Sequence, residues 1–573
     1  MANEVKGVDR PLKDILATAL VSYYQIPDYQ RPYQWTEKNC TKLLDDLFSS
    51  YEYYKGSGYF CGSLVLIVIN TDSETNAETY DIVDGQQRLS TFILLAKVLA
   101  TLYDKDLKPT SRELLEKSLG DIDGEKRERL HFNAMGLNAK DDFVYALEHF
   151  NDSQASKNKN NKNNYLKNAI CLKNYLKEKE IEDINDFIKW LYFKVVFIKT
   201  TCPNVSMALR IFSVLNARGL ALNATDIFKG ELLKHAKEHE REEFVSRWND
   251  LSQKCSDNDL KIETLFSWYL TYLNPVTSKE KMEKRLVTWF NKLNKTPLEY
   301  LKGVEDFYNA YGEVLGMQDR HAYLLSYKDD DYLRVILCAS LLHRYSDQDI
   351  EALKELLVKF YYQNWVATRE EPKKQTNCNI IKALKEKKSV ESIASIVKEY
   401  LDYHKITQDF KKNLQDSKLY EQHKKSSKNS WLRPILILVE YSMSDDPRPK
   451  RIQMNDFHVE HILPQQPGSS SQWVKDFSEE ERELYTHSLA NLTLLGGTKN
   501  TQASNKDFKE KKEIYMGNAV KLGKDKRGRE KTFKVMTCYK MTIDVAQCTE
   551  WTPTSLEKRK EELIQKIESV LAL

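Results

Sequence analysis

The residues best able to do chemistry lie in one stretch near the C-terminus, where Glu460 and His461 are adjacent and Pro464 follows closely. Asn491 stands before a short apolar run, and Asn500 follows it nine residues later. A hard divalent cation prefers oxygen ligands, which a glutamate carboxylate and an asparagine amide can supply. A neutral imidazole beside the cation can take a proton from an attacking water while the metal neutralises the leaving oxygen. The spacing therefore indicates phosphodiester hydrolysis with one bound metal.

Three local elements must position these side chains. Residues 457–463 have the apolar alternation of a strand, which the following proline ends because proline cannot donate to a ladder. Residues 491–495 predict a second short strand, closed by the turn dipeptide Gly496-Gly497. Residues 504–507 form a capping-box signature for a helix. The predicted order is strand, strand, helix.

This order and its residues resemble the ββα-metal layout of HNH nucleases. The resemblance implies that His461 is the general base and that Glu460 and Asn500 are ligands of Mg²⁺ or Mn²⁺. It also implies a catalytic role for Asn491, which would hold the loop and orient the imidazole.

Two points of geometry stay open. In a straight strand Glu460 and His461 point to opposite faces, so both can serve one site only if the chain bends just after them. His458 lies on the same face as Glu460 and is a candidate extra ligand, while Asn505 competes with Asn500 for the metal position. A plainer alternative is that Glu460 and His461 form a solvated pair at a strand end.

The segment that follows the motif is rich in positive charge. Residues 499–531 hold eleven Lys/Arg against five Asp/Glu, a balance that suits contact with a phosphate backbone. A solvated, lysine-rich helical surface is the alternative. The candidate DNA-binding residues are Lys499, Lys506, Lys509 and Lys512.

Composition bounds the class of protein. A chain of 573 residues is too long for a single hydrophobic core and suggests about three domains of ~150–200 residues each. The net charge of +3 says little about partners. The nine scattered cysteines form no CxxC, which argues against a zinc site and for a reducing, cytoplasmic location. Apolar runs fall short of the ~20 residues that a membrane helix needs, so no membrane partner is expected.

A second chemical motif lies near the N-terminus. An apolar strand over residues 62–70 and a short strand over 79–83 lead into Asp84-Gly-Gln-Gln-Arg88 and then a helix. The free N–H groups and positive dipole of a helix start attract anions, and Arg88 adds a fork that can grip phosphate. Capping of the helix by Asp84 and Gln87 is the alternative explanation.

The segments IPDYQRPYQW, GSLVL, VDGQQRLSTF and FSVLNARGLALNATDIFKG, in this order, resemble the N-terminal domain of GmrSD-like type IV restriction enzymes. The resemblance implies a fold similar to ParB and sulfiredoxin domains, with nucleotide binding and hydrolysis at the DGQQR turn. Arg31 and Arg88 would bind phosphate, and Asp84 would bind metal or orient water. No Walker motif is present, and the triphosphate is left open among GTP, UTP and ATP. The implied pocket comprises Gln30, Arg31, Asp84, Gly85, Gln86, Gln87, Arg88, Asn216, Arg218 and Asp226.

The predicted fold is α+β and mostly helical. We expect a ParB/sulfiredoxin-like α/β domain over residues 1–240, a helical connector over 241–430 and an HNH domain over 431–573. Residues 417–430, rich in lysine and serine, are expected to be a solvated linker at the second boundary.

The expected function is a nucleotide-regulated, metal-dependent DNA endonuclease that cleaves foreign, modified phage DNA in antiviral defence. Two alternatives remain. One is a nucleotide-gated DNA-binding regulator with an idle nuclease, and the other is a toxin-like nuclease acting on RNA or host DNA. Whether the chain forms a homo-oligomer, and which modification it senses, are left open.

Overall fold

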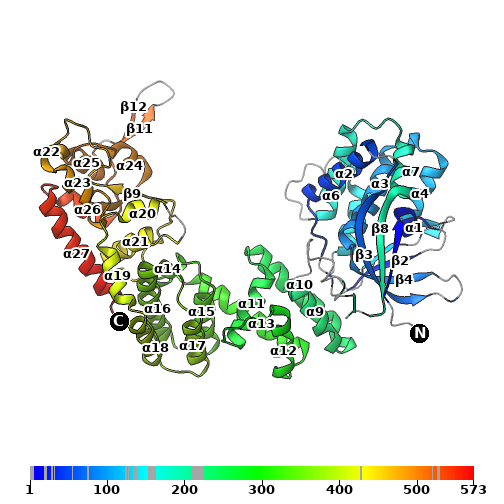
Figure 1. The fold of residues 1–573 in the computed structure, drawn as a ribbon, viewed down its shortest axis with the longest axis horizontal. Coiled ribbons are helices and arrows are strands. Elements are labelled where there is room, and N and C mark those ends of the chain that lie inside the picture. Colours follow the sequence, from blue (N-terminus) through cyan, green and yellow to red (C-terminus); the bar gives the residue numbers. More distant parts are fainter. Residues whose placement is uncertain are drawn as a thin grey trace. The chain divides into compact units, whose positions relative to one another are not determined.

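The computed structural model describes residues 5–18, 22–27, 30, 32–53, 56–71, 73, 77–122, 125–126, 128–132, 139–152, 163–204, 207–208, 211, 224–425, 429–518, 520–524 and 530–573. The chain divides into two compact units (Figure 1). The first comprises Met1–Phe266 with Glu280–Gly303, and the second Ser267–Lys279 with Val304–Leu573. The structure is mostly helical with a mixed sheet, which confirms the predicted α+β class. The predicted three-domain division remains a prediction.

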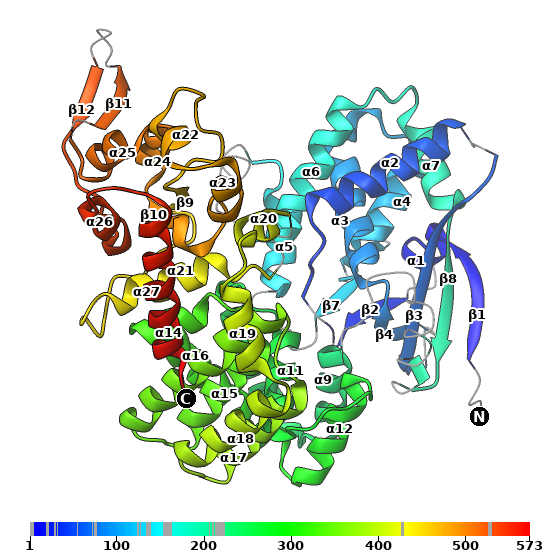
Figure 2. The same ribbon diagram turned by 60° about the vertical axis from the view of Figure 1, so that its left-hand side comes forward.

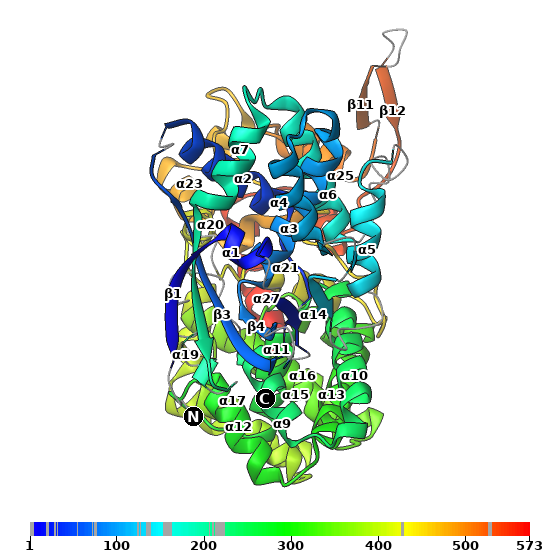
Figure 3. The same ribbon diagram turned by 90° about the vertical axis from the view of Figure 1, so that its right-hand side faces the viewer.

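The first unit is built on a six-stranded sheet in the order β1-β8-β3-β4-β2-β7. β1 pairs antiparallel with β8, and β3 antiparallel with β4, while the other neighbours are parallel. Figure 3 shows β1, β8 and β3 side by side. The strands are β1 (Lys6–Pro11), β2 (Tyr23–Ile26), β3 (Tyr59–Thr71), β4 (Glu78–Asp84), β7 (Leu130–Phe132) and β8 (Val195–Cys202), with a separate pair β5 (Asp121–Ile122) and β6 (Glu125–Lys126).

Helices cover this sheet because the apolar side chains of its middle strands need burial on both faces. The larger core joins β3 and β4 to the helices of one layer, with Leu64 and Ile82 fully buried. That layer contains α1 (Leu12–Leu16), α2 (Glu37–Tyr53), α3 (Gln86–Leu102), α4 (Pro109–Leu119), α5 (Ala139–His149), α6 (Asn164–Glu178) and α7 (Ile184–Lys194), with a short 3₁₀ turn at Asp104–Asp106.

A smaller cluster occupies the other face of the sheet. Val65, Ile67 and Val83 pack there with Ile227 from α9 (Ala224–His235). The remaining helices that begin in the first unit are α10 (Glu238–Asp257), α11 (Ile262–Leu273), α12 (Met282–Leu293) and α13 (Pro297–Gly316). Both α11 and α13 contain a unit boundary.

The second unit begins with a helical array and ends with the chemical motif (Figure 2). Its first helices are α14 (Arg320–Ser326), α15 (Asp331–Leu342), α16 (Asp347–Thr368), α17 (Lys374–Lys385), α18 (Val390–Tyr403), α19 (Ile406–Leu414), α20 (Leu419–Lys425) and α21 (Leu432–Ser442). Residues 304–430 of the predicted connector thus share a compact unit with the C-terminal part.

The C-terminal part alternates short strands and helices. Its elements are β9 (His458–His461), α22 (Gln472–Asp476), α23 (Glu479–Tyr485), the 3₁₀ turn Leu489–Asn491, β10 (Leu492–Leu495), α24 (Gly497–Ala503), α25 (Phe508–Tyr515), β11 (Val520–Lys524), β12 (Glu530–Phe533), α26 (Lys540–Gln547) and α27 (Pro553–Leu571). β9 pairs antiparallel with β10, and β11 with β12. Among the described residues, no helix is long and apolar enough to cross a bilayer.

Two local predictions in this region are wrong. Gly496-Gly497 does not form an isolated turn, because Gly497 is the first residue of α24. Ser504 does not cap the following helix: its φ of 38° ends α24, and α25 starts after Asp507 without a side-chain capping bond. The four polar residues 504–507 fitted the capping pattern, but Ser504 closes α24 and the next helix begins only after Asp507.

Candidate active site

The pairing of β9 with β10 places the chemical residues. His461 lies opposite Leu492 and Glu460 opposite Thr493, so the strand end carrying both side chains is held by the ladder. The chain then turns, and Asn491 holds that turn from a fully buried position. Its Oδ1 accepts from Leu463 N (2.7 Å), and its Nδ2 donates to Leu463 O (2.8 Å) and Thr486 O (2.9 Å).

His461 is buried and uncharged. Burial, with help from the charges of His487, Lys511 and Lys424, lowers the pKa of His461 to about 3. The edge of the Tyr420 ring packs against the imidazole, with centroids 4.2 Å apart at 83°. The Nε2 atom has no hydrogen-bond partner among the described residues. The neutral imidazole has an unsatisfied nitrogen that can accept a hydrogen bond from a bound reactant, and a pKa of about 3 makes it a weak base until a nearby negative charge raises that pKa.

The other ring nitrogen of His461 contacts an amide. Gln465 Nε2 lies 3.3 Å from Nδ1 of His461. A carboxamide can present either its nitrogen or its oxygen to such a partner. With the Gln465 oxygen turned inward, Nδ1 donates the hydrogen bond and Nε2 carries the lone pair that a base requires.

Glu460 is anchored from α25, which the sequence analysis did not connect to it. Lys511 Nζ donates to Glu460 Oε1 (2.7 Å), and the Tyr515 hydroxyl donates to the same oxygen (2.9 Å). Burial raises the pKa of Glu460, and the two donors act against that rise. Both contacts leave Oε2 of Glu460 without a hydrogen bond from any described residue. The i,i+4 spacing of Lys511 and Tyr515 on a predicted helix is the signal that can reveal such a pair.

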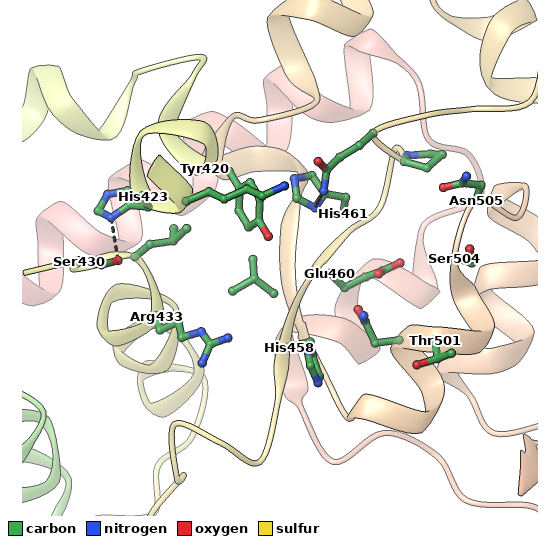
Figure 4. A pocket seen from close by; sticks show the side chains of 16 residues that line it. Tyr420, His423, Ser430, Arg433, His458, Glu460, His461, Thr501, Ser504 and Asn505 are labelled. Atoms are coloured by element: carbon green, nitrogen blue, oxygen red, sulfur yellow. Dashed lines mark hydrogen bonds between the residues drawn. The ribbon is translucent and has the colours of Figure 1, made fainter. Parts of the chain in front are cut away.

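A cavity of about 750 Å³ joins these side chains to α24 (Figure 4). It is lined by Glu460, His461, His458 and both candidate asparagines, Asn500 and Asn505. Asn500 lies within α24, and its Oδ1 has no hydrogen-bond partner among the described residues. His458 is exposed and lies over the start of α24. The carboxylate of Glu460, the orphaned oxygen of Asn500 and the accessible imidazole of His458 line one cavity and are donor types that suit Mg²⁺ or Mn²⁺, and the orphaned oxygen favours Asn500 over Asn505.

The opposite wall of the cavity comes from the segment expected to be a solvated linker, and that expectation is wrong. Residues 419–425 form α20, and Tyr420, His423 and Lys424 of this helix line the cavity together with Arg433 of α21. In Figure 4, Arg433 lies across the cavity from Glu460. Tyr420 N donates to His487 O (3.0 Å), which ties α20 to the chain before β10. Lysine and serine content alone did not reveal this packing.

The four candidate DNA-binding lysines have different surroundings. Lys499 is buried and its ammonium donates to the carbonyls of Tyr515 and Val535. Lys512 donates to Cys548 O (2.9 Å). These two ammonium groups bond to backbone carbonyls, and a role for them in DNA binding stays a prediction. Lys506 pairs with Glu510 on the surface, and Lys509 is exposed.

In the first unit, the DGQQR turn joins β4 to α3. Gly85 has φ 97°, and a Cβ there would lie 2.7 Å from Leu64 Cδ1, so the turn requires glycine. Arg88 NH2 lies 3.1 Å from Asp84 Oδ2, and its NH1 donates to Cys61 O (2.7 Å). The guanidinium is therefore fixed beside the N-terminus of α3. The N-cap residue of α3 is Gly85, which has no side chain to cap the helix, and capping by Asp84 and Gln87 stays an alternative.

The glutamines of the motif hold the early loop against this turn. Gln87 Oε1 accepts from the backbone N–H groups of Gln34 (2.8 Å) and Trp35 (3.0 Å). Gln30 is buried and donates to Val83 O (2.6 Å). Gln86 is also buried, in the first turn of α3. The early loop and the DGQQR turn thus share one site, although they are about 50 residues apart.

The remaining predicted pocket residues are less well placed. Arg31, Asn216 and Arg218 lie outside the described residues. Asp226 is in the first turn of α9, and the neighbouring Ile227 packs in the cluster that contains Val83. This packing brings α9 to the sheet face beside the end of β4. Direct participation of Asp226 in the pocket stays a prediction.

Two family models match the chain. Residues 12–233 match the model described as GmrSD restriction endonuclease, N-terminal domain. Residues 405–566 match the model described as GmrSD restriction endonucleases, C-terminal domain, and this stretch includes α20 as well as β9–α25. No match to a curated protein was found. The two matches together cover more than half of the chain, and the chain belongs to the GmrSD family of restriction endonucleases.

Proposed function

We propose that the protein is a divalent-metal-dependent endonuclease that cuts DNA at the cavity beside His461. The observation that carries the proposal is that one cavity is lined by His461 and Asn500, whose Nε2 and Oδ1 atoms have no hydrogen-bond partner among the described residues, and by the carboxylate of Glu460. Membership of a restriction endonuclease family supports DNA as the substrate. The ββα-metal arrangement of HNH nucleases accounts for the order β9, β10 and the helices that follow.

The roles of the chain's own residues follow from their surroundings. Glu460, Asn500 and His458 would hold Mg²⁺ or Mn²⁺, which when bound would neutralise charge on the leaving oxygen. His461 takes the proton of the attacking water, because burial keeps its imidazole neutral. Asn491 fixes the turn after His461 and so the direction of the ring. Tyr420 limits the rotation of that ring from the other side.

We further propose that the first unit binds and hydrolyses a nucleoside triphosphate and thereby regulates cleavage, on a fold similar to ParB and sulfiredoxin. Arg88 beside the start of α3 offers a fixed cation, and the helix N-terminus adds N–H donors. Gln30, Gln86 and Gln87 shape the wall of the site by holding the early loop to the turn. Foreign DNA with modified bases or backbone is the proposed target, and antiphage defence the proposed role.

The decisive experiment compares the intact protein with His461→Ala on plain and modified phage DNA, with and without Mg²⁺ and triphosphates. We expect metal-dependent cleavage that the substitution reduces by about 100-fold or more. His404→Ala is the matched control, because His404 is an exposed histidine in the same unit. Undiminished cleavage by His461→Ala would overturn the assignment of the base.

The same experiment separates the alternatives. DNA binding without cleavage under every metal condition would favour a regulator with an idle nuclease. Cleavage of RNA or of host DNA, together with growth arrest on expression without phage, would favour a toxin.

A further inference from the structure

The cavity beside His461 has a positively charged wall that comes from outside the β9–α25 motif. Lys424 lies on α20 and is exposed, and Arg433 lies on α21. Both line the same cavity as Glu460 and His461. The effect of Lys424 on the pKa of both His461 and His487 places its charge close to the site.

The cations of this wall have no carboxylate partner. Neither Lys424 nor Arg433 forms an ion pair with any residue that the structure describes. Among the described residues, Glu460 is the only acidic one that lines the cavity, and it already pairs with Lys511. The cavity therefore carries an excess of positive charge, and it is large enough to admit more than a water molecule or an ion.

Arg433 is held in place before any ligand arrives. Its NH1 donates to Met454 O (2.9 Å), and its guanidinium lies over the Phe457 ring, 5.4 Å from the centroid. A guanidinium fixed in this way keeps its other N–H donors available and loses little side-chain entropy when it binds an anion. Lys424 is a mobile point charge on the neighbouring helix, so the two can bind successive oxygens of one chain.

We propose that Lys424 and Arg433 bind phosphate oxygens of the nucleic acid strand that is cut at His461. The inference rests on the proposed nuclease function and adds a binding wall to it. The proposed metal ligands and these cations come from different elements around the cavity, and Arg433 lies across it from Glu460, so a strand between them would contact both (Figure 4). The α20 segment is then part of the substrate site and not a spacer between domains.

The test measures binding of a short DNA duplex to the full-length His461→Ala protein, which removes cleavage from the readout. Lys424→Met and Arg433→Met are added singly and together, and affinity is measured over a series of salt concentrations. Each lost phosphate contact should lower the slope of log K against log[salt] by about 0.9. We expect about a threefold to tenfold loss of affinity for each variant at low salt.

Two matched variants control the test. Lys425→Met removes an equally exposed charge from the next position of α20, which does not line the cavity, and should change the salt slope much less. Lys424→Arg keeps the charge and should restore binding. Because Arg433 also supports Met454 O and the Phe457 ring, thermal unfolding of its variants is compared with that of the parent.

The outcomes separate this inference from the function on which it rests. If the intact protein cuts DNA but Lys424→Met and the double variant keep the parental affinity and salt slope, the binding wall is wrong and the nuclease stands. If Lys425→Met weakens binding as much as Lys424→Met, the effect is diffuse surface charge and the inference fails. If the intact protein neither binds nor cuts nucleic acid, both proposals fail.

Discussion

Lys511 Nζ lies 2.7 Å from Glu460 Oε1, and the two side chains are 0% and 6% exposed. The same ammonium donates to His461 O (2.6 Å), so one lysine fixes both members of the Glu460–His461 pair. The carboxylate is thereby presented through its second oxygen, Oε2. A buried pair of this kind constrains geometry more than it adds to stability, because the desolvation of both charges offsets their attraction.

Lys511→Met should destabilise the protein strongly. Removing one partner of a buried ion pair leaves an uncompensated charge and costs about 3–5 kcal/mol of unfolding free energy. Chemical denaturation measures the loss, with Lys509→Met on the same helix, exposed and expected within about 0.5 kcal/mol, as the control. The double variant Glu460→Gln/Lys511→Met should lose less than Lys511→Met alone. A single variant as stable as the parent would show that the pair is not formed.

Substitution of Asn491 should lower stability and cleavage more than substitution of the exposed Asn505. Asn491→Ala leaves the buried N–H and C=O of Leu463 and the carbonyl of Thr486 without this partner, at about 1–3 kcal/mol for each group. Asn491→Asp keeps the acceptor for Leu463 N but sets a fully buried carboxylate oxygen against two carbonyl oxygens, so it should cost at least as much as Asn491→Ala. Thermal unfolding and cleavage are measured for both, and Asn505→Ala serves as the control. Equal stability of all three variants would contradict the role of Asn491.

The proposed metal site predicts that the two asparagines differ in their effect on metal binding. Asn500→Ala removes an unsatisfied oxygen from the cavity and should weaken Mn²⁺ binding by at least about tenfold, which is the lower range for loss of a supporting residue around a metal. Asn505→Ala should have a smaller effect. Calorimetry with Mn²⁺ reports binding directly, independently of cleavage. The reverse order of effects would transfer the ligand role to Asn505.

The buried histidines predict how stability depends on pH. Burial lowers the pKa of His461 to about 3 and that of His423 to about 4, so the unfolded chain binds more protons than the folded protein below about pH 6.5. The contribution of these histidines to the free energy of unfolding is therefore fully present above that pH. It falls as the pH drops toward 4, at up to about 1.4 kcal/mol per pH unit for each histidine.

Replacing either histidine tests this slope. His461→Gln should reduce the slope of unfolding free energy against pH between 4.5 and 6.5 by the amount due to one bound proton, about 1.4 kcal/mol per pH unit. Denaturation at a series of pH values provides the measurement. The exposed His404→Gln should leave the slope as it is. An unchanged slope in His461→Gln would mean that the imidazole is not buried in its neutral form.

The geometry of the DGQQR turn predicts that a positive charge at position 88 is not enough and that arginine itself is required. Arg88 uses two nitrogens for two partners, Asp84 and the Cys61 carbonyl, which a lysine cannot reproduce. We expect Arg88→Ala to abolish triphosphate hydrolysis and Arg88→Lys to reduce it by about 100-fold. Phosphate release is the readout, and the exposed Arg112→Ala is the control. Normal hydrolysis by Arg88→Ala would remove the nucleotide assignment.

The sequence predicted those features that depend on short-range order. The strand β4, the glycine turn at Gly85 and the helix after it follow from neighbouring residues, and so does the existence of β9, which spans His458–His461 and not the whole predicted range 457–463. The α+β class and the family were likewise predictable, because the hydrophobic periodicity and the order of the motifs can be read from the sequence without knowing how the elements pack. Capping at Ser504 was wrong because a local pattern cannot show that α24 takes up the residues before it.

Long-range contacts were beyond the same reasoning. Lys511 and Tyr515 bond to Glu460 although they lie 51 and 55 residues away in the sequence. Tyr420 packs against His461 from a segment that was expected, from its composition, to be a solvated linker. The sequence marked Lys499 as a candidate DNA contact, whereas in the structure its ammonium donates to the carbonyls of Tyr515 and Val535. Burial and partners of a charged side chain depend on which elements pack together.

The sequence by itself determined the chemical groups and their order along the chain: carboxylate, imidazole and amides near the C-terminus, and an arginine after a glycine turn near the N-terminus. Only the tertiary structure decided which of these groups are satisfied by neighbours and which face a cavity. The physical reason is that hydrogen bonding and desolvation act through space, so the availability of Glu460 Oε2, Asn500 Oδ1 and His461 Nε2 depends on packing.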